Sequence, residues 1–586
     1  MKHLFSVFVI LIIALNAIAQ DVSYSNKLIE KYQNGRNQLK STNSVSIDHF
    51  WLTPVLLEAK QNWNKLTDEA KNLFGELAER PKFIGTEEVA TYANFAFHYS
   101  TDGPSDESVD TTDVDKSGIP DYVEEMAFIF SDSIYSLYHK TTKLTIPPND
   151  EDQINGAYYD IYINGEKTGA NVYGYVQAED SVGDNTNSST ITETNSFTSF
   201  MVMRNNYIGF PKSEKISLSV TAAHEYMHAI QFGYAFDMST WFKEATATWS
   251  EEYAFPGFDD NFQYLTHVFS KTDVALNYED GQDSTSGELD GHWYSSWLFV
   301  KYLTEQTNTS IIQNIFEGCI SKNSIHAIDQ VLKDNWKSDF ETIFLQYVIA
   351  NSLLVSDHEF APYNYKRASD YFNKIEKDSL IKYEGRLDFI GQDINFSSRT
   401  DGNNRLMRLS YENYRLSSTD NFKIEFSSSN STNEVDIILI KCSLENGTSI
   451  QMPTYSENSS IIEVNDNNSW DYYIPVILRL DKDIENIETV NYDLIIKKGN
   501  ITNILEPKLV NQIYPNPAND KVYVNIDGLD SDLVNIELID LTGKKVINEQ
   551  MKNKSAFDVS KVLAGIYILR ISNERGEISN TKQVIK

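Results

Sequence analysis

The stretch that most constrains this chain of 586 residues is 217–252, SLSVTAAHEYMHAIQFGYAFDMSTWFKEATATWSEE. His224 and His228 are four residues apart, so on a helix their imidazoles stand one turn above each other and can bind one metal ion. Glu225, next to His224, is then placed to act as general base toward an attacking water. The spacing predicts a helix that carries a catalytic zinc site. The alternative is an ordinary core helix in which the three residues meet this pattern by chance.

The residues that follow the two histidines predict a helix that stops and a second helix that returns. Gly233 is a natural helix stop, and residues 237–240 offer loop and N-cap residues before the next apolar run. The second helix carries Glu244, with fifteen residues between it and His228. A returning helix can therefore supply Glu244 as the third zinc ligand and leave one position for water.

This stretch resembles a known class of metallopeptidase. WFKEATATWSEE, residues 241–252, is similar to the WxxEGxAxYxE stretch that carries the glutamate ligand in gluzincin metallopeptidases. HEYMHAIQFGY followed by WFKEATATW resembles a family of secreted bacterial metalloproteases in the same clan, peptidase MA. The resemblance implies a β-rich N-terminal lobe, a helical C-terminal lobe and one zinc ion. Two departures are the shorter gap before Glu244 and Ala245 in place of the usual glycine.

Two residues further along are candidates for stabilising the oxyanion of the transition state. Tyr294 opens the predicted helix YSSWLFVKYL, where related zinc peptidases place a tyrosine that donates to the oxyanion. His292 lies two residues earlier and could donate in the same way. For both side chains the alternative is plain packing at the start of a helix.

The region before the zinc helix is predicted to be rich in strands. TYANFAFHYS, starting at Thr91, has a period of two and predicts one strand, and further short strands follow between residues 155 and 210. In gluzincins the strand just before the zinc helix edges the cleft and pairs with extended substrate. The resemblance places Phe200 to Arg204 in that role, with an ordinary core strand as the alternative.

A second group of oxygen side chains lies at 113–124, DVDKSGIPDYVE. Oxygen donors stand at loop positions one, three, five, nine and twelve with Gly118 at six, which is the ligand order of an EF-hand calcium loop. Ser at position five and Pro at eight depart from that pattern, and no entering helix precedes the loop. We therefore predict one structural calcium loop that runs into a helix, with a solvated acidic turn as the alternative. The predicted ligands are Asp113, Asp115, Ser117, Asp121 and Glu124.

The N-terminus has the features of an export signal. Lys2 and His3 precede an apolar run from Leu4 to Leu15, and Ala17–Ala19 offers a small-x-small cleavage site. The run is short for a membrane anchor, and no second long apolar segment follows. From residue 21 to about 82 the pattern is helical, which leaves open whether this segment is a propeptide that covers the cleft or a helical lead-in.

Helical patterns continue after the zinc helices, and beyond about Tyr383 they give way to alternating segments that predict a β-sandwich. Near the C-terminus, YPNP at 514–517, GK at 543–544 and GIY at 565–567 precede a basic end. In this order they resemble the C-terminal sorting domain of type IX secretion in Bacteroidetes. The resemblance implies a small module of seven strands that contacts the secretion machinery.

Charge and cysteine content narrow the remaining possibilities. The net charge of -34 argues against nucleic acid as a partner, because an acidic surface repels polyanions. Cys319 and Cys442 fall in segments assigned to different domains, so we expect two buried thiols rather than a disulfide. We expect a monomer, without a transmembrane segment, at or outside the surface of a Gram-negative cell.

Together these features predict a multidomain α+β chain that is a secreted zinc-dependent endopeptidase acting on proteins or peptides. The alternative is a catalytically inactive adhesion or glycan-binding protein that retains the metallopeptidase fold; the intact Glu225 favours the enzyme. An aminopeptidase would carry a GxMEN-type stretch, and none precedes His224. The predicted parts are a signal peptide (1–19), a helical segment or propeptide (20–85), a gluzincin-like domain (86–385), a β-sandwich (386–505) and a sorting domain (510–586).

Overall fold

The protein is described by a computed structural model, in which the chain divides into two compact units. The first comprises Met1–Tyr264, Ser286–Lys301 and Thr309–Ser324, and the second comprises the rest of the chain. The predicted signal peptide lies outside the described residues, and the predicted domain boundaries stay predictions. The structure describes residues 21–33, 52–150, 158–168, 172–279, 291–356, 360–377 and, with short gaps, most of 385–585.

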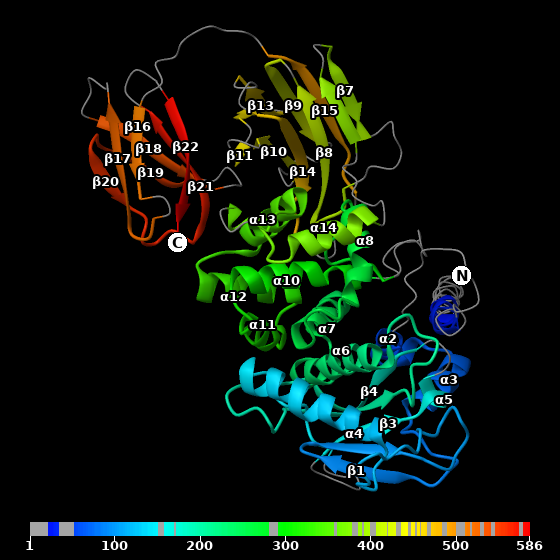
Figure 1. The fold of residues 1–586 in the computed structure, drawn as a ribbon. Coiled ribbons are helices and arrows are strands. Elements are labelled where there is room, and N and C mark those ends of the chain that lie inside the picture. Colours follow the sequence, from blue (N-terminus) through cyan, green and yellow to red (C-terminus); the bar gives the residue numbers. More distant parts are fainter. Residues whose placement is uncertain are drawn as a thin grey trace, which may run out of the picture. The chain divides into compact units, whose positions relative to one another are not determined.

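The chain has a mixed α/β fold with several separate sheets (Figure 1). The sheet of the first unit has the strand order β1-β2-β3-β5-β4. In this sheet β2 and β5 run parallel to β3, whereas β1 and β4 are antiparallel to their neighbours. The strands are β1 (Glu88–Tyr92), β2 (Phe95–Tyr99), β3 (Tyr159–Ile163), β4 (Gly174–Gly183) and β5 (Ser196–Met203).

One prediction about these strands is wrong, and for Phe200 to Arg204 the alternative of an ordinary core strand is confirmed. TYANFAFHYS forms a tight hairpin between β1 and β2 rather than one strand, and the chain reverses at Ala93, whose φ is 50°. Phe200 to Arg204 does not lie at the edge of the sheet, because β5 pairs with β3 on one side and β4 on the other. A strand that is paired on both sides has no free backbone groups for a peptide, so the strand at this edge is β4.

Helix α6 (Glu214–Tyr234) lies between this sheet and α7 (Thr240–Ala254), and Figure 1 shows α6 and α7 side by side. Ser213 begins α6 by accepting a hydrogen bond from Ile216 N at its hydroxyl. Every residue of α6 from Ser217 to Tyr234 is buried, because the sheet covers one side and α7 another. This burial fixes the helix that carries both candidate histidines.

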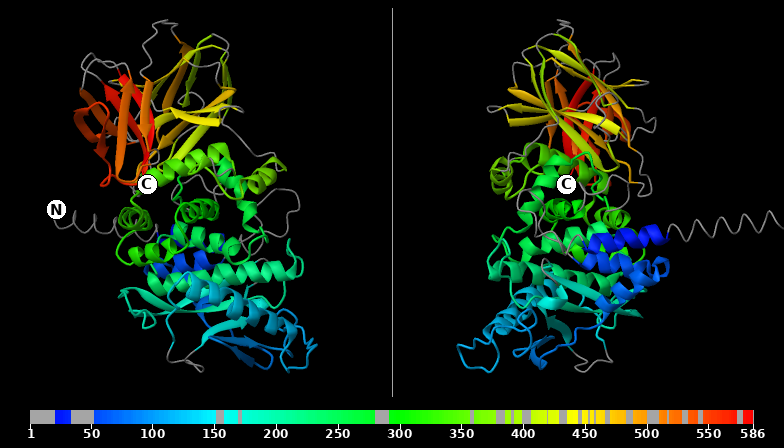
Figure 2. Two further views of the ribbon diagram at one scale, coloured as in Figure 1. Left: turned by 60° about the vertical axis from the view of Figure 1, so that its left-hand side comes forward. Right: turned by 90° about the vertical axis from the view of Figure 1, so that its right-hand side faces the viewer.

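The N-terminal segment is helical as predicted, with a helix over 21–33 followed by α2 (Thr53–Gln61) and α3 (Asp68–Ala78). In the side view of Figure 2 the blue helices lie against the rest of the first unit. Their apolar faces share one core with the sheet, which also explains the helical spacing of the sequence. The segment contributes Leu28, Tyr32, Leu52, Val55, Leu56, Ala59, Leu66, Ala70, Phe74 and Leu77, and the sheet region contributes Tyr162, Val172, Tyr175, Phe200 and Val202.

Most of the other described helices lie in predicted helical regions, whereas the short α5 (Gly165–Thr168) lies in the region predicted to be strands. The loop at 113–120 runs into a helix as expected, α4, which continues as a wider π-helical stretch, η3. Among the described residues, no helix combines the length and the apolar character needed to cross a membrane. The helices are α4 (Asp121–Phe128), η3 (Ile129–Thr141), α5 (Gly165–Thr168), η4 (Asn261–Tyr264), α8 (Leu265–Ser270), α9 (His292–Ser295), α10 (Trp297–Gln306), α11 (Ile311–Cys319), α12 (Ser324–Trp336), α13 (Phe340–Leu353) and α14 (Ala368–Lys377).

The second unit contains two five-stranded sheets that share one apolar core, as in a β-sandwich. Their strand orders are β11-β10-β14-β8-β6 and β12-β13-β9-β15-β7. Cys319 and Cys442 are both free and buried, as predicted. The strands are β6 (Gly385–Phe389), β7 (Ile394–Ser397), β8 (Ser410–Ser418), β9 (Phe422–Ser428), β10 (Val435–Ser443), β11 (Gly447–Gln451), β12 (Thr454–Ser456), β13 (Ser459–Val464), β14 (Tyr472–Arg479) and β15 (Tyr492–Lys498).

The last strands of the described chain form a three-stranded and a four-stranded sheet around a separate core. Their orders are β16-β17-β20 and β19-β18-β21-β22, so this module has the predicted seven strands in its described part. The strands are β16 (Val510–Tyr514), β17 (Lys521–Asp527), β18 (Leu533–Ile539), β19 (Lys545–Lys552), β20 (Ser555–Asp558), β21 (Gly565–Ser572) and β22 (Ile578–Ile585).

A partly buried charge network joins the N-terminal segment to the sheet. Arg80 donates from Nε and Nη2 to the two carboxylate oxygens of Glu179, over 2.6 and 2.7 Å, and it also contacts Asp150 and Asp160. On the other side of Asp160, His98 Nε2 lies 3.1 Å from Oδ1, and His98 Nδ1 lies 2.8 Å from Glu87. Burial lowers the pKa of His98, but the two carboxylates outweigh it and raise that pKa above 6.5.

His98 should therefore make the stability of the protein depend on pH. Its pKa is higher in the folded than in the unfolded chain, so its contribution is fully present below the unfolded value and is lost as pH rises through the folded value. We expect the destabilisation by His98→Gln to be largest near about pH 6 and to shrink toward about pH 9. Urea unfolding of both proteins across this range measures it, and a difference independent of pH would contradict the assignment.

Candidate metal centre

Helices α6 and α7 bring the three predicted zinc ligands together. One ligand atom from each of His224, His228 and Glu244 lies within 4.8 Å of the others, and all three residues are buried. Nε2 of His224 is 3.4 Å from Glu244 Oε2, and Nε2 of His228 is 3.5 Å from Glu244 Oε1. Among the described residues this is the group of His, Cys, Asp and Glu side chains with the geometry to hold a metal ion.

Two further buried residues orient the imidazoles. Nδ1 of His224 lies 2.8 Å from Glu251 Oε1, and Nδ1 of His228 lies 2.8 Å from Gln231 Oε1. Because Glu251 Oε1 and Gln231 Oε1 are acceptors, each Nδ1 carries the proton and each Nε2 presents a lone pair to the centre. Gln231 is itself fixed, since its amide donates to Lys243 O over 3.0 Å and to Thr246 Oγ1 over 2.9 Å.

Sequence reasoning did not find Glu251 and Gln231, although spacing contains a signal for both. Glu251 follows Glu244 by seven residues, which is about two helical turns, so the two carboxylates share a face of α7. Gln231 follows His228 by three residues and lies on the same face of α6. A search for polar side chains one or two turns from each candidate ligand would have singled them out.

The atoms at this centre fit a metal ion better than they fit one another. His228 Nε2 and both oxygens of Glu244 are buried and make no hydrogen bond in the structure, although buried polar atoms are normally paired. Burial raises the pKa of Glu244, but the two imidazoles outweigh it and lower that pKa to about 2. Burial lowers the pKa of His224 to about 4. Burial also lowers the pKa of His228, but Glu244 and Glu225 outweigh it and raise that pKa above 6.5, so zinc would have to displace a proton from His228. One carboxylate and two imidazoles form a donor set that proteins use for catalytic zinc.

Glu225 faces the same region from α6 and is completely buried. Its Oε2 accepts a hydrogen bond of 2.7 Å from the hydroxyl of Thr53. Burial, the largest influence, raises the pKa of Glu225 to about 7, and the charge of His228 opposes that shift. A carboxylate with a pKa near neutrality can both accept and return a proton at the same pH.

Tyr294 is brought beside the centre, in the short helix α9. Its ring centroid is 6.3 Å from that of His224 and 5.2 Å from that of Tyr264. His292 is the first residue of the same helix, and both side chains are buried. Tyr294 does not open the longer helix as expected, because the helix is interrupted at Ser296 before α10 starts at Trp297.

The predicted calcium loop folds around its first aspartate. Asp113 accepts hydrogen bonds from the backbone amides of Ser117 and Gly118, and Asp115 also accepts from Ser117 N. Gly118 has a φ of +89°, which is the turn that motivated the prediction. No three of the predicted carboxylate ligands come within 4.8 Å of one another among the described residues. The loop therefore has the expected turn, and calcium binding stays a prediction.

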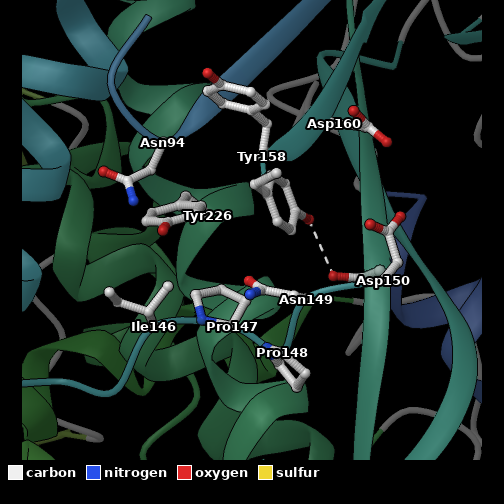
Figure 3. Close-up of a pocket in the computed structure, with 11 residues that line it drawn as sticks. Asn94, Ile146, Pro147, Pro148, Asn149, Asp150, Tyr158, Asp160 and Tyr226 are labelled. Carbon is white, nitrogen blue, oxygen red and sulfur yellow. Dashed lines mark hydrogen bonds between the residues drawn. The ribbon is translucent and has the colours of Figure 1, made fainter. Parts of the chain in front are cut away.

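A separate small pocket is lined in part by Tyr226 of α6 (Figure 3). Asn94, Tyr158, Asp150 and Asp160 are among its lining residues, and none of the candidate metal ligands is. In Figure 3 the two aspartates lie on the same side of the pocket; these are the carboxylates that Arg80 contacts.

Comparison with known proteins places only the C-terminal part of the chain. Residues 512–586 match the family described as "Secretion system C-terminal sorting domain". The protein is secreted or displayed at the cell surface. This match confirms the type IX sorting prediction and implies contact with the secretion machinery, and it does not reach the metal centre.

No curated protein matches the chain. A solved structure of Ruminococcus gnavus β-glucuronidase is 8% identical, over 30% of this chain and 34% of that chain, with a TM-score of 0.11. The full extracellular region of zebrafish Gpr126/Adgrg6 is 9% identical, over 33% and 30%, with a TM-score of 0.13. The chain thus spans about a third of the length of these proteins, and at such TM-scores the likeness carries no argument.

Proposed function

We propose that this chain is a secreted zinc-dependent endopeptidase with a gluzincin-like catalytic domain. The observation that carries the proposal is the convergence of His224, His228 and Glu244 within 4.8 Å, beside a buried Glu225. The buried atoms of His228 and Glu244 without hydrogen bonds support a bound ion, and the export module supports action outside the cell. A protein or peptide substrate follows from the resemblance of the zinc-binding stretch.

In this proposal the chain's own residues bind the ion and move the proton. His224, His228 and Glu244 would hold zinc, which when bound supplies Lewis-acid activation of water and of the substrate carbonyl. Glu225, with a pKa of about 7, would take the proton of the attacking water and return it to the leaving amine. Hydrolysis is then balanced: the C–N bond breaks, the water's hydroxyl ends on the acyl carbon, and the water's other proton, carried by Glu225, ends on the leaving nitrogen.

Tyr294 is our first candidate for stabilising the oxyanion, because its ring lies beside His224. A donor that is already in place when negative charge develops on the carbonyl oxygen lowers the barrier without reorganisation. His292 stays the second candidate on the same short helix.

Glu251 is expected to set the zinc affinity through the orientation of His224. Removing a carboxylate that holds a ligand histidine typically weakens metal binding about 10–100-fold, so Glu251→Ala should do the same. A competition titration with a chromogenic zinc chelator measures it. Glu252→Ala is the matched control, because Glu252 is the next residue and pairs with Lys301 over 3.0 Å instead. Equal zinc affinities of the two variants would refute the orienting role.

The test of the proposed function is the zinc content of the purified chain and its hydrolysis of casein and quenched peptides, beside Glu225→Gln. Bound zinc and hydrolysis that requires Glu225 are the expected results. A chain that binds no zinc overturns the proposal. A chain that binds zinc but remains inert in every form favours the adhesion or glycan-binding alternative.

A further inference from the structure

The proposed general base is in contact with a residue that belongs to neither metal-binding helix. Thr53, the first residue of α2, donates from its hydroxyl to Glu225 Oε2 over 2.7 Å. The same hydroxyl accepts from the backbone N–H of Val176 over 2.9 Å. Thr53 and Glu225 are both completely buried. The Thr53 hydroxyl therefore makes hydrogen bonds with two groups at once. One is the Glu225 carboxylate, which would receive the proton, and the other is a backbone N–H of β4.

Helix α2 lies against β4 at the edge of the sheet, as the position of Val176 shows. β4 is the last strand of its sheet, and it pairs only with β5 within the described sheet. Because Val176 N–H donates to Thr53, it points away from β5, to the free side of β4. Extended peptides bind to sheets by pairing with the free backbone groups of an edge strand. Thr53 thus occupies a donor that such a peptide would use, directly beside Glu225.

The rest of the N-terminal segment is anchored around this contact. Helices α2 and α3 both contact β4, and their apolar faces are part of the core that Tyr175 and Phe200 also form. Gln61 Nε2, at the end of α2, donates to Phe236 O over 3.2 Å. Arg80, after α3, binds Glu179 on β4 through two hydrogen bonds. Hydrogen bonds at both ends of α2 and after α3 thus hold the part of the segment from residue 52 onward.

We propose that the described parts of the N-terminal segment, 21–33 and 52–82, act as a built-in inhibitory segment that keeps the site latent. The proposal rests on the proposed function, and it decides between a covering propeptide and a helical lead-in, which the sequence left open. In the latent state Glu225 accepts a hydrogen bond from Thr53. Substrate reaches the free edge of β4 only when α2 moves away from that strand. The expected partner of the vacated surface is an extended peptide that pairs with β4 and places its carbonyl near Glu225.

The junction between segment and sheet offers a place to test this in the full chain. Residues 79–87 have no regular structure, and the Lys82 side chain is 87% exposed. A recognition site for a sequence-specific protease inserted between Lys82 and Phe83 allows the link to the segment to be cut in the folded chain, after which the segment can dissociate. We expect hydrolysis of quenched peptides to rise at least about tenfold while zinc content is unchanged. Hydrogen exchange of 174–183 should become faster.

Thr53→Val in the uncut chain provides a second test that does not depend on removing the segment. Valine keeps the shape of threonine but loses the hydrogen bonds of the hydroxyl to Glu225 and to Val176 N, so α2 should leave β4 more often. The uncut variant should therefore hydrolyse peptides several-fold faster than wild type. Thr67→Val is the matched control, because the Thr67 hydroxyl caps α3 in the same segment, where it accepts from Ala70 N. It should weaken the helix without raising the rate.

The outcomes separate the two proposals. If Glu225-dependent hydrolysis is equally fast in uncut and cut protein, and in Thr53→Val and Thr67→Val, the inhibitory role is wrong and the peptidase stands. If no form shows Glu225-dependent hydrolysis, the proposed function falls and the inhibitory role with it. Faster hydrolysis after cutting, together with faster exchange of β4, supports both.

Discussion

Glu225→Gln is expected to lower peptide hydrolysis by a factor on the order of 10²–10⁴, measured on the chain cut between Lys82 and Phe83. Glutamine keeps the size of the side chain and can still accept the hydrogen bond from Thr53. It cannot take the proton of the attacking water, so only the acid–base contribution is lost. Because Glu225 is not one of the three clustered ligands, zinc content should stay at the wild-type value.

The measurement is the initial rate of hydrolysis of quenched peptides, with zinc determined by mass spectrometry on the same samples. Glu214→Gln is the matched control, because Glu214 lies in the first turn of the same helix and its side chain is exposed. A Glu225→Gln variant that keeps more than about a tenth of the wild-type rate would exclude Glu225 as the general base.

Glu244→Gln is expected to reduce zinc affinity by more than about 100-fold, because even changes outside the ligand shell cost about 10–100-fold. Zinc that binds only the folded chain adds about 4 kcal/mol of stability when its free concentration is about 1,000 times its Kd. Chelation should therefore lower the melting temperature of wild type and leave that of Glu244→Gln unchanged. Without metal, the variant should be less stable than wild type near neutral pH, because the two imidazoles lower the pKa of Glu244 and so favour its charged form in the folded chain.

Thermal unfolding with zinc and with chelator, on both proteins, measures this difference. Glu252→Gln, on the same helix, is the control, and it should lose stability on chelation as wild type does. If chelation destabilises Glu244→Gln as much as wild type, Glu244 does not bind the ion. If chelation changes neither protein, the centre binds no metal under these conditions.

Most of the candidate metal centre could be predicted from the spacing of residues that are close in the sequence. His224, Glu225 and His228 are related by one turn of a helix, and a helix fixes the relative positions of residues three and four apart. The helices, the strands of the sorting module and the buried thiols of Cys319 and Cys442 follow from period and composition in the same way. The turn at Ala93 was missed because alanine is a rare residue at positive φ.

The order of the strands in a sheet cannot be predicted from the spacing of neighbouring residues. The sequence contains β4 before β5, and nothing in its period says that β5 is inserted between β3 and β4. A buried interior strand and an edge strand covered by a helix have the same apolar pattern, so the sequence left both alternatives open for Phe200 to Arg204. The assignment of the edge to β4 follows only from the pairing of backbone groups.

By itself, the sequence determined that two imidazoles and a carboxylate lie on a returning helix pair, and that the chain is exported. These features could be predicted because helix geometry and turns depend on residues that are close together in the sequence. Only the tertiary structure placed the Thr53 hydroxyl on Glu225, across a separation of 172 residues, and Glu251 on His224. Contacts between residues so far apart depend on how whole elements pack, and no local pattern encodes that.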